Sequence, residues 1–211
     1  MKSFNAVLGV GLVAMSFAAT AAPGLSYNYV QASYVSLSPD NTPYDKITGF
    51  NVGISGLIGE GVFVFGNYSD ADTDDFTVGT PPLSATGVIA FKQYKAGLGL
   101  RGPLAMTPAT DINFTAAFLR QEQKGEKGFA GSGADVDGNG YELGAGVRHL
   151  FMPQFEVGLG AEYDNVSNTG THHTTGVANA LFHVTPMFSV VGGYSYNKHT
   201  DGWAAGARIN F

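Results

Sequence analysis

Apolar residues alternate with glycine, polar or charged residues in one segment after another of this 211-residue chain. In YELGAGVRH (141–149), Tyr, Leu, Ala and Val share one face, while Glu, two Gly and Arg share the other. GFNVGISG (49–56), FEVGLGAEYD (155–164) and WAAGARINF (203–211) repeat this pattern. A period of two is that of a β-strand, whose successive side chains point to opposite faces. The chain is therefore expected to be all-β.

The length and chemistry of these segments favour a membrane. They run for about 9 to 12 residues, which is long for a globular sheet but suits a tilted strand that crosses a bilayer. One apolar face and one face of glycine, Glu and Arg fit a lipid-facing exterior and a polar lumen. A soluble sandwich is the alternative, and it would bury Leu143, Val157 and Leu159 between two sheets and turn Glu142 and Arg148 to water.

We predict an antiparallel up-and-down transmembrane β-barrel of ten strands, with eight as the other possible count. The connections alternate long and short, which is typical of outer-membrane barrels with exterior loops and tight periplasmic turns. Five exterior loops then place both termini on the periplasmic side. The expected strands lie near 25–37, 47–57, 62–69, 88–101, 111–122, 140–150, 155–164, 175–184, 188–197 and 202–211.

Aromatic residues should gather at the two edges of the membrane. Two segments give no clear facing. In VFVFGNYS (62–69) apolar residues occupy both faces, and in TGVANALFHV (175–184) the apolar residues fit either of the two possible facings. The exterior level is expected to hold Tyr34, Phe50, Tyr68, Tyr94, Phe118, Tyr141, Tyr163, Tyr194, Tyr196 and Trp203, and the periplasmic level Phe155, Phe182, Phe188 and Phe211.

The first residues resemble an export signal. Lys2 precedes an apolar run from Ala6 to Phe17 that is too short to span a bilayer, and a small-x-small site ends at Ala21. We predict a signal peptide at 1–21, cleaved after Ala21, and a barrel domain at 22–211. Loss of Lys2 from 11 basic residues against 17 acidic ones leaves a net charge of −7, which disfavours nucleic acid. The chain has no cysteine, so disulfides and thiolate metal sites are excluded.

KAGLGLRG (95–102) has the G-x-G-x-x-G spacing of a dinucleotide-binding turn. That turn needs a buried strand before it and a helix after it, whereas here Pro103 and Pro108 interrupt the segment that follows. The strand pattern explains the glycines instead. Gly97 and Gly99 face inward, where a narrow barrel has little room beside long charged side chains.

SYNYVQASYV (26–35) and the terminal WAAGARINF resemble the small outer-membrane barrels of Gram-negative bacteria, the OmpA/OmpX-like superfamily. Within it they are most similar to the diffusible-signal-factor-regulated outer-membrane proteins. The resemblance implies that Phe211, with Ile209 and Trp203, is read by the outer-membrane insertion machinery. It also implies contact with outer-membrane lipid and lipopolysaccharide after export through the periplasm. It implies no activity, since such barrels serve many functions.

Two motifs bear on metals. DVDGNG (135–140) offers Asp135, Asp137 and Asn139 as weak candidate calcium ligands, but the position that should supply a bidentate Glu is Gly146. The acidic run DADTDD (70–75) is read as a solvated exterior loop rather than a cation site. We therefore expect no resident metal and no cofactor.

A rim enzyme is a further possibility. His172, His173, His199 and Asp201 lie in expected exterior loops, where omptin-type proteases carry Asp and His pairs. The order of His199 and Asp201 is reversed and the chain is short for such a protease. A lipid-modifying barrel is the other enzymatic alternative. We expect no catalytic role.

The inward charges either line a conducting lumen or pair and close it. An unpaired charge in a tight lumen is costly, so pairing is favoured. The expected function is therefore envelope structure or surface recognition and adhesion through loops whose ligand the sequence does not define; a narrow porin-like channel is the alternative. The lumen charges are Lys95, Arg101, Glu142, Arg148, Glu156, Glu162 and Arg208.

Overall fold

The computed structural model describes residues 25–211, except 41, 44, 81–82, 105–108, 128–134 and 168–170. The predicted signal peptide and its cleavage site lie outside the described residues. No helix in the described part of the chain is long and apolar enough to cross a membrane. The strands are β1 (Tyr29–Pro39), β2 (Ile47–Leu57), β3 (Val62–Thr73), β4 (Phe76–Thr80), β5 (Leu83–Pro103), β6 (Thr110–Lys127), β7 (Val136–Met152), β8 (Phe155–Val166), β9 (Thr171–His183), β10 (Phe188–Asn197) and β11 (Thr200–Asn210).

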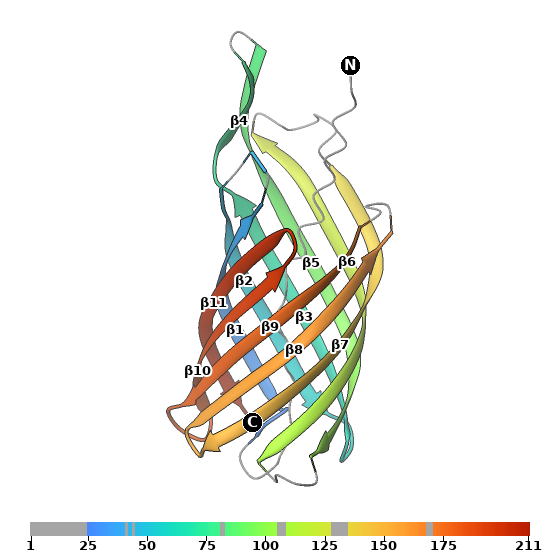
Figure 1. Cartoon of the computed structure of the whole chain (residues 1–211), viewed down its shortest axis with the longest axis vertical. Coiled ribbons are helices and arrows are strands. Elements are labelled where there is room, and N and C mark those ends of the chain that lie inside the picture. Colours follow the sequence, from blue (N-terminus) through green and yellow to red (C-terminus); the bar gives the residue numbers. More distant parts are fainter. Residues whose placement is uncertain are drawn as a thin grey trace.

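The strands form one closed antiparallel barrel (Figure 1). The first and last strands meet in the register Tyr29↔Asn210, and β3 pairs with β5. The short strand β4 pairs only with β5, in the register Phe76↔Gly87, and continues the line of β3. The ten strands other than β4 therefore form the wall. This confirms the predicted ten-stranded up-and-down barrel.

The apolar face of each strand points outward. Leu143 and Leu159 are 51% and 54% exposed, whereas Glu142, Arg148 and Glu156 are 3%, 1% and 0% exposed. A soluble sandwich would show the opposite arrangement, because its large apolar side chains would lie between sheets. The wall thus presents hydrocarbon to the outside and charge to the inside, as a transmembrane barrel requires.

The structure resolves the facing of the two ambiguous segments. In β3, Phe63 and Phe65 are buried in the interior and Val64 is exposed between them. In β9, Leu181 is buried and Phe182 is exposed. Apolar residues therefore point into the interior at these places, which is why alternation gave no answer there.

An aromatic band surrounds part of the outer face at the end of the barrel far from Leu25 and Phe211. The Trp203 ring lies 5.6 Å from that of Tyr34, and the Tyr68 ring lies 5.9 Å from Phe50 and 5.1 Å from Tyr94. These rings come from β11, β1, β2, β3 and β5, which are neighbours in the wall. The band brings together five of the ten aromatic residues that were predicted to share one edge of the membrane, and is called the girdle below.

Several predicted exterior loops are strands instead. β3 and β5 extend well past the girdle, and β4 pairs with β5 to continue the same hairpin, which rises above the rest of the barrel in Figure 1. Asp70 and Asp72 therefore lie in β3, and His172 and His173 lie in β9. Beyond the membrane the outer face of a strand contacts water and can carry polar residues while the backbone continues to pair, whereas Ala71 and Thr73 on the inner face of β3 stay buried.

The interior is apolar at both ends along β1 and β3 and polar between them. At the far end, Val35, Leu37, Ile47, Ala71, Phe76, Phe91 and Ala204 form one cluster. At the end that carries Leu25 and Phe211, here called the terminal end, Tyr27, Tyr29, Phe63, Phe65 and Ala117 form another. Gly99 lies beside the second cluster, and a Cβ there would lie 1.8 Å from Phe63 Cζ. The glycine spacing thus makes room for an aromatic ring.

Candidate functional site in the barrel interior and at its rim

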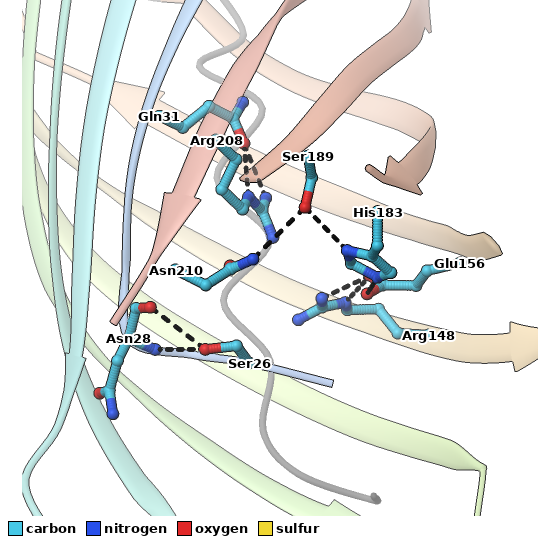
Figure 2. A network of polar contacts seen from close by, with 9 residues as sticks. All are labelled: Ser26, Asn28, Gln31, Arg148, Glu156, His183, Ser189, Arg208 and Asn210. Carbon is cyan, nitrogen blue, oxygen red and sulfur yellow. Dashed lines mark hydrogen bonds and ion pairs between the residues drawn. The ribbon is translucent and has the colours of Figure 1, made fainter. Parts of the chain in front are cut away.

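A buried polar network joins β7, β8, β9, β10 and β11 near the terminal end (Figure 2). Arg148 pairs with Glu156, its neighbour across the β7–β8 turn. The other carboxylate oxygen of Glu156 lies 3.6 Å from His183 Nε2, and His183 Nδ1 lies 2.7 Å from Ser189 Oγ. Asn210 Nδ2 donates to the same hydroxyl at 3.3 Å. Each strand of this half of the barrel contributes one polar side chain.

Arg208 continues the network across the seam between β11 and β1. Its Nε and Nη2 donate to Gln31 Oε1 at 3.0 and 2.7 Å, and Gln31 Nε2 donates to Ser33 Oγ at 3.3 Å. The guanidinium carbon lies 3.9 Å from the ring centre of Tyr29. A neutral amide and an aromatic face thus hold this cation at 2% exposure.

A second cluster lies closer to the girdle. Lys95 of β5 pairs with Glu142 of β7, and its Nζ lies 3.7 Å from Glu162 of β8. Asp164 stands opposite Glu142 in the strand register and is 4% exposed. One buried ammonium thus meets carboxylates from two adjacent strands. Because these groups are removed from water, their attraction is stronger than that of a surface pair.

Arg101 lies at the terminal end of β5 and pairs with Asp111 of β6, with 3.6 Å between Nη1 and Oδ2. Its guanidinium carbon is 5.5 Å from the ring centre of Tyr27. All seven charges proposed from the sequence to line the lumen therefore point inward. The structure brings them into two clusters rather than one row.

Sequence reasoning missed several partners in these clusters. Gln31, Asp111, Asp164 and His183 lie on the inward phase of their strands and contact the expected charges. The phase of Asp164 was readable from its own segment, FEVGLGAEYD. His183 lies in a segment of ambiguous phase, and Gln31 becomes a partner only once the first and last strands meet.

At the rim, the structure brings two of the proposed histidines together. The rings of His173 and His199 lie 5.9 Å apart, nearly perpendicular. Asp201 points elsewhere, since its Oδ2 accepts a hydrogen bond from Tyr194 Oη at 3.3 Å. Asp70 accepts one from Tyr68 Oη at 2.7 Å. Both carboxylates thus face tyrosines, whereas a general base needs an orienting partner of its own.

The calcium-like motif is not a loop. Asp137 and Asn139 lie in β7, paired with β6, and the Asp137 carboxylate lies 3.9 Å from Arg120. Asp135 Oδ1 accepts a hydrogen bond from the backbone of Gly125 at 3.0 Å. An extended strand spreads alternate side chains along one face, whereas calcium needs them around one point. Among the described residues, no group of three metal-ligating side chains comes together.

The proposed assembly residues all face outward. Phe211, Ile209 and Trp203 are 67%, 53% and 49% exposed. Phe211 also borders a shallow apolar hollow of about 290 Å³ on the outer face of β2 and β3, where Gly56 and Gly66 leave room beside it. The end of the chain is thus accessible from the membrane side.

The fold is that of the outer-membrane β-barrels, and solved structures of this class are similar to it. The β-domain of the Bordetella autotransporter BrkA has a TM-score of 0.53 at 12% identity, covering 87% of this chain and 98% of that one. The translocator domain of autotransporter NalP from Neisseria meningitidis has 0.52 at 12% identity, covering 87% of each chain. The KdgM porin in complex with disordered oligogalacturonate has 0.50 at 10% identity, covering 87% and 99%.

No protein-family model and no curated protein matches the chain. At 10 to 12% identity the solved structures establish the architecture alone. They include a porin and two autotransporter domains, so one barrel shape serves different functions.

Proposed function

We propose that this chain is a non-enzymatic outer-membrane protein that presents a raised sheet on the cell surface to a ligand or partner, or as part of the envelope. The observation that carries the proposal is a contrast within the wall. The interior is filled with paired charges between two apolar clusters, whereas one side of the wall rises far beyond the membrane.

The strand lengths give the size of that rise. At about 3.3 Å per residue and a tilt of about 45°, the 21 residues of β5 cover roughly 49 Å of height and the 10 residues of β10 roughly 23 Å. The apolar band of such a barrel is about 25 Å tall. β10 therefore matches the membrane, while β5 carries about half its length beyond it.

The outer face of the raised sheet is charged. Lys92 lies 3.6 Å from Asp70, and Arg120 Nε donates to Glu122 at 2.9 Å. These groups lie above the aromatic girdle, at the level of lipopolysaccharide headgroups or beyond. Lipid and lipopolysaccharide are therefore its first partners. We also propose that the chain is a member of the diffusible-signal-factor-regulated group. It would be exported through the periplasm after cleavage of residues 1–21.

Two measurements test the proposal. Folded protein in detergent should migrate differently before and after boiling, because barrels of this kind resist unfolding until heated. In planar bilayers it should give no steady current, because the interior side chains close the lumen. An open, steady current would overturn the closed barrel in favour of a narrow channel. A hydrolase activity that the native protein shows and a His199→Ala variant lacks would overturn the non-enzymatic assignment.

We also propose that Phe211 is recognised during insertion into the outer membrane. Its exposed ring supports this, since a side chain that packed inside would be hidden. Deletion of Phe211 should lower the amount of barrel assembled in cells without changing its urea midpoint after refolding in detergent. Equal assembly of both proteins would overturn the assignment.

A further inference from the structure

Two histidines meet at the rim of the barrel, far from its terminal end. His173 belongs to β9, and His199 lies in the turn that joins β10 to β11. Their ring centres are 5.9 Å apart, and the rings are inclined at 78°. Two imidazoles that bind one Zn²⁺ through nitrogens at about 2.0–2.1 Å have ring centres roughly 5–6 Å apart. The spacing of the pair therefore fits two ligands of one metal ion.

Hydrogen bonds hold the two histidines in place relative to each other. Asn197 Oδ1 accepts hydrogen bonds from the backbone N of His199 at 2.8 Å and of Thr200 at 2.9 Å. Asn197 Nδ2 donates to Thr175 Oγ1 at 3.4 Å. Thr175 lies on β9 two residues after His173, so both side chains point to the same face of the strand. The turn and the strand are thus joined before any ion binds, which lowers the cost of binding.

A buried carboxylate lies beside the pair. Asp164 of β8 stands opposite His173 in the strand register and is 4% exposed. Side chains directly opposite each other on antiparallel strands have Cβ atoms about 4.5–5.5 Å apart. Oδ1 of Asp164 accepts no hydrogen bond from the described part of the chain. A dication at the histidines would be attracted to this carboxylate, and strongly so because the carboxylate is removed from water.

The two imidazoles select the kind of ion. Imidazole nitrogen suits zinc, copper and nickel, whereas calcium and magnesium take oxygen ligands. No third metal-ligating side chain joins the pair among the residues that the structure describes, so water completes the coordination shell. The ion is therefore an exchangeable ligand. His199 is exposed, so an ion can reach the pair from solution.

We propose that His173 and His199 form a binding site for a divalent transition-metal ion such as Zn²⁺ at the rim of the barrel. The bound ion links β9 to the turn between β10 and β11 and so braces this mouth of the barrel. The inference goes beyond the proposed surface function, which involves no metal.

Titration of the folded, detergent-solubilised protein with ZnCl₂, followed by calorimetry, tests the proposal. The chain has no cysteine, so thiolates cannot bind the zinc, and the protein must be made without a histidine tag. The native protein should bind zinc at this site. His173→Ala and His199→Ala should each weaken that binding at least about tenfold, because loss of a group that merely supports a ligand already costs about 10- to 100-fold.

His172→Ala is the matched control. His172 directly precedes His173 on β9 and is exposed on the opposite face of the strand, so this variant should bind zinc as the native protein does. CaCl₂ at the same concentrations should give no binding, because calcium prefers oxygen ligands. The boiling-dependent gel shift without zinc shows that each variant is folded. If His173→Ala does not fold, His199→Ala carries the same expectation, since its side chain is exposed in a turn.

Three results would overturn the proposal. The first is a native protein that binds no zinc, or a folded His199→Ala variant that binds it equally well. The second is an equal loss in His172→Ala, which would place the ion on the outer face of β9. The third is calcium binding as tight as zinc binding, which would show that carboxylates hold the ion. Failure of the proposed closed surface barrel would appear separately, as a steady current in planar bilayers.

Discussion

Replacement of Glu156 by Gln should strongly destabilise the folded barrel. Glu156 is 0% exposed and pairs with Arg148, which is 1% exposed. Gln keeps the shape of the side chain but leaves the guanidinium buried without its counter-charge. Breaking a buried pair in this way costs about 3–5 kcal/mol. With a urea slope of about 2 kcal/mol per M, the unfolding midpoint should fall by roughly 2 M.

The assay is urea unfolding in detergent or lipid vesicles, followed by tryptophan fluorescence. Trp203 is the single tryptophan of the chain and faces the membrane, so its emission reports the loss of that environment. Glu60→Gln is the matched control, since Glu60 is exposed in the turn between β2 and β3 and its change should stay within about 0.5 kcal/mol. The double variant Arg148→Met/Glu156→Met should recover most of the loss.

An unchanged midpoint for Glu156→Gln would refute the reasoning. It would mean that water reaches Arg148 and solvates it, so the lumen would be wet at this level. A double variant less stable than either single variant would refute it as well, because removal of both charges should relieve the unpaired one.

Two further changes probe the inner and outer faces of the wall, both by urea unfolding. Gly99→Ala should cost about 1–3 kcal/mol, because the added Cβ lies 1.8 Å from Phe63 Cζ, whereas Gly102→Ala on the same strand meets nothing within 4 Å and should change little. Equal effects would contradict the close contact. Leu159→Arg, midway between the two membrane edges, should cost about 2–4 kcal/mol in lipid, and Ile58→Arg in a turn about 0–1 kcal/mol. A tolerated Leu159→Arg would argue against a lipid-facing wall.

The alternation of residue types predicted most of the wall because lipid and lumen demand opposite chemistry. Glu142, Arg148 and Leu159 therefore face as their segments indicated. The alternation could not show which face points inward where the interior itself is apolar, as at Phe63 and Phe65. There the apolar end of the interior and the lipid select the same kind of side chain.

The raised sheet was not predictable for a related reason. Asp70 and Asp72 look like a loop because they lie on the outer face of β3 above the membrane, where that face no longer needs to be apolar. Polar partners, whether in ion pairs or in hydrogen bonds, were predictable only within a hairpin. Arg148 and Glu156 are eight residues apart, but Arg208 and Gln31 are separated by 177 residues and meet only through barrel closure.

During evolution, the residues on the two faces of this wall should also change in different ways. An outward Leu touches fluid lipid, so Ile, Val or Phe can replace it singly without loss of a specific neighbour. An inward group such as Arg208 is matched to Gln31 on another strand, so one can change freely only when the other changes with it. Substitutions should therefore accumulate one at a time on the membrane side and in compensated pairs inside. Distant relatives of this chain are then better recognised by paired interior positions than by overall identity.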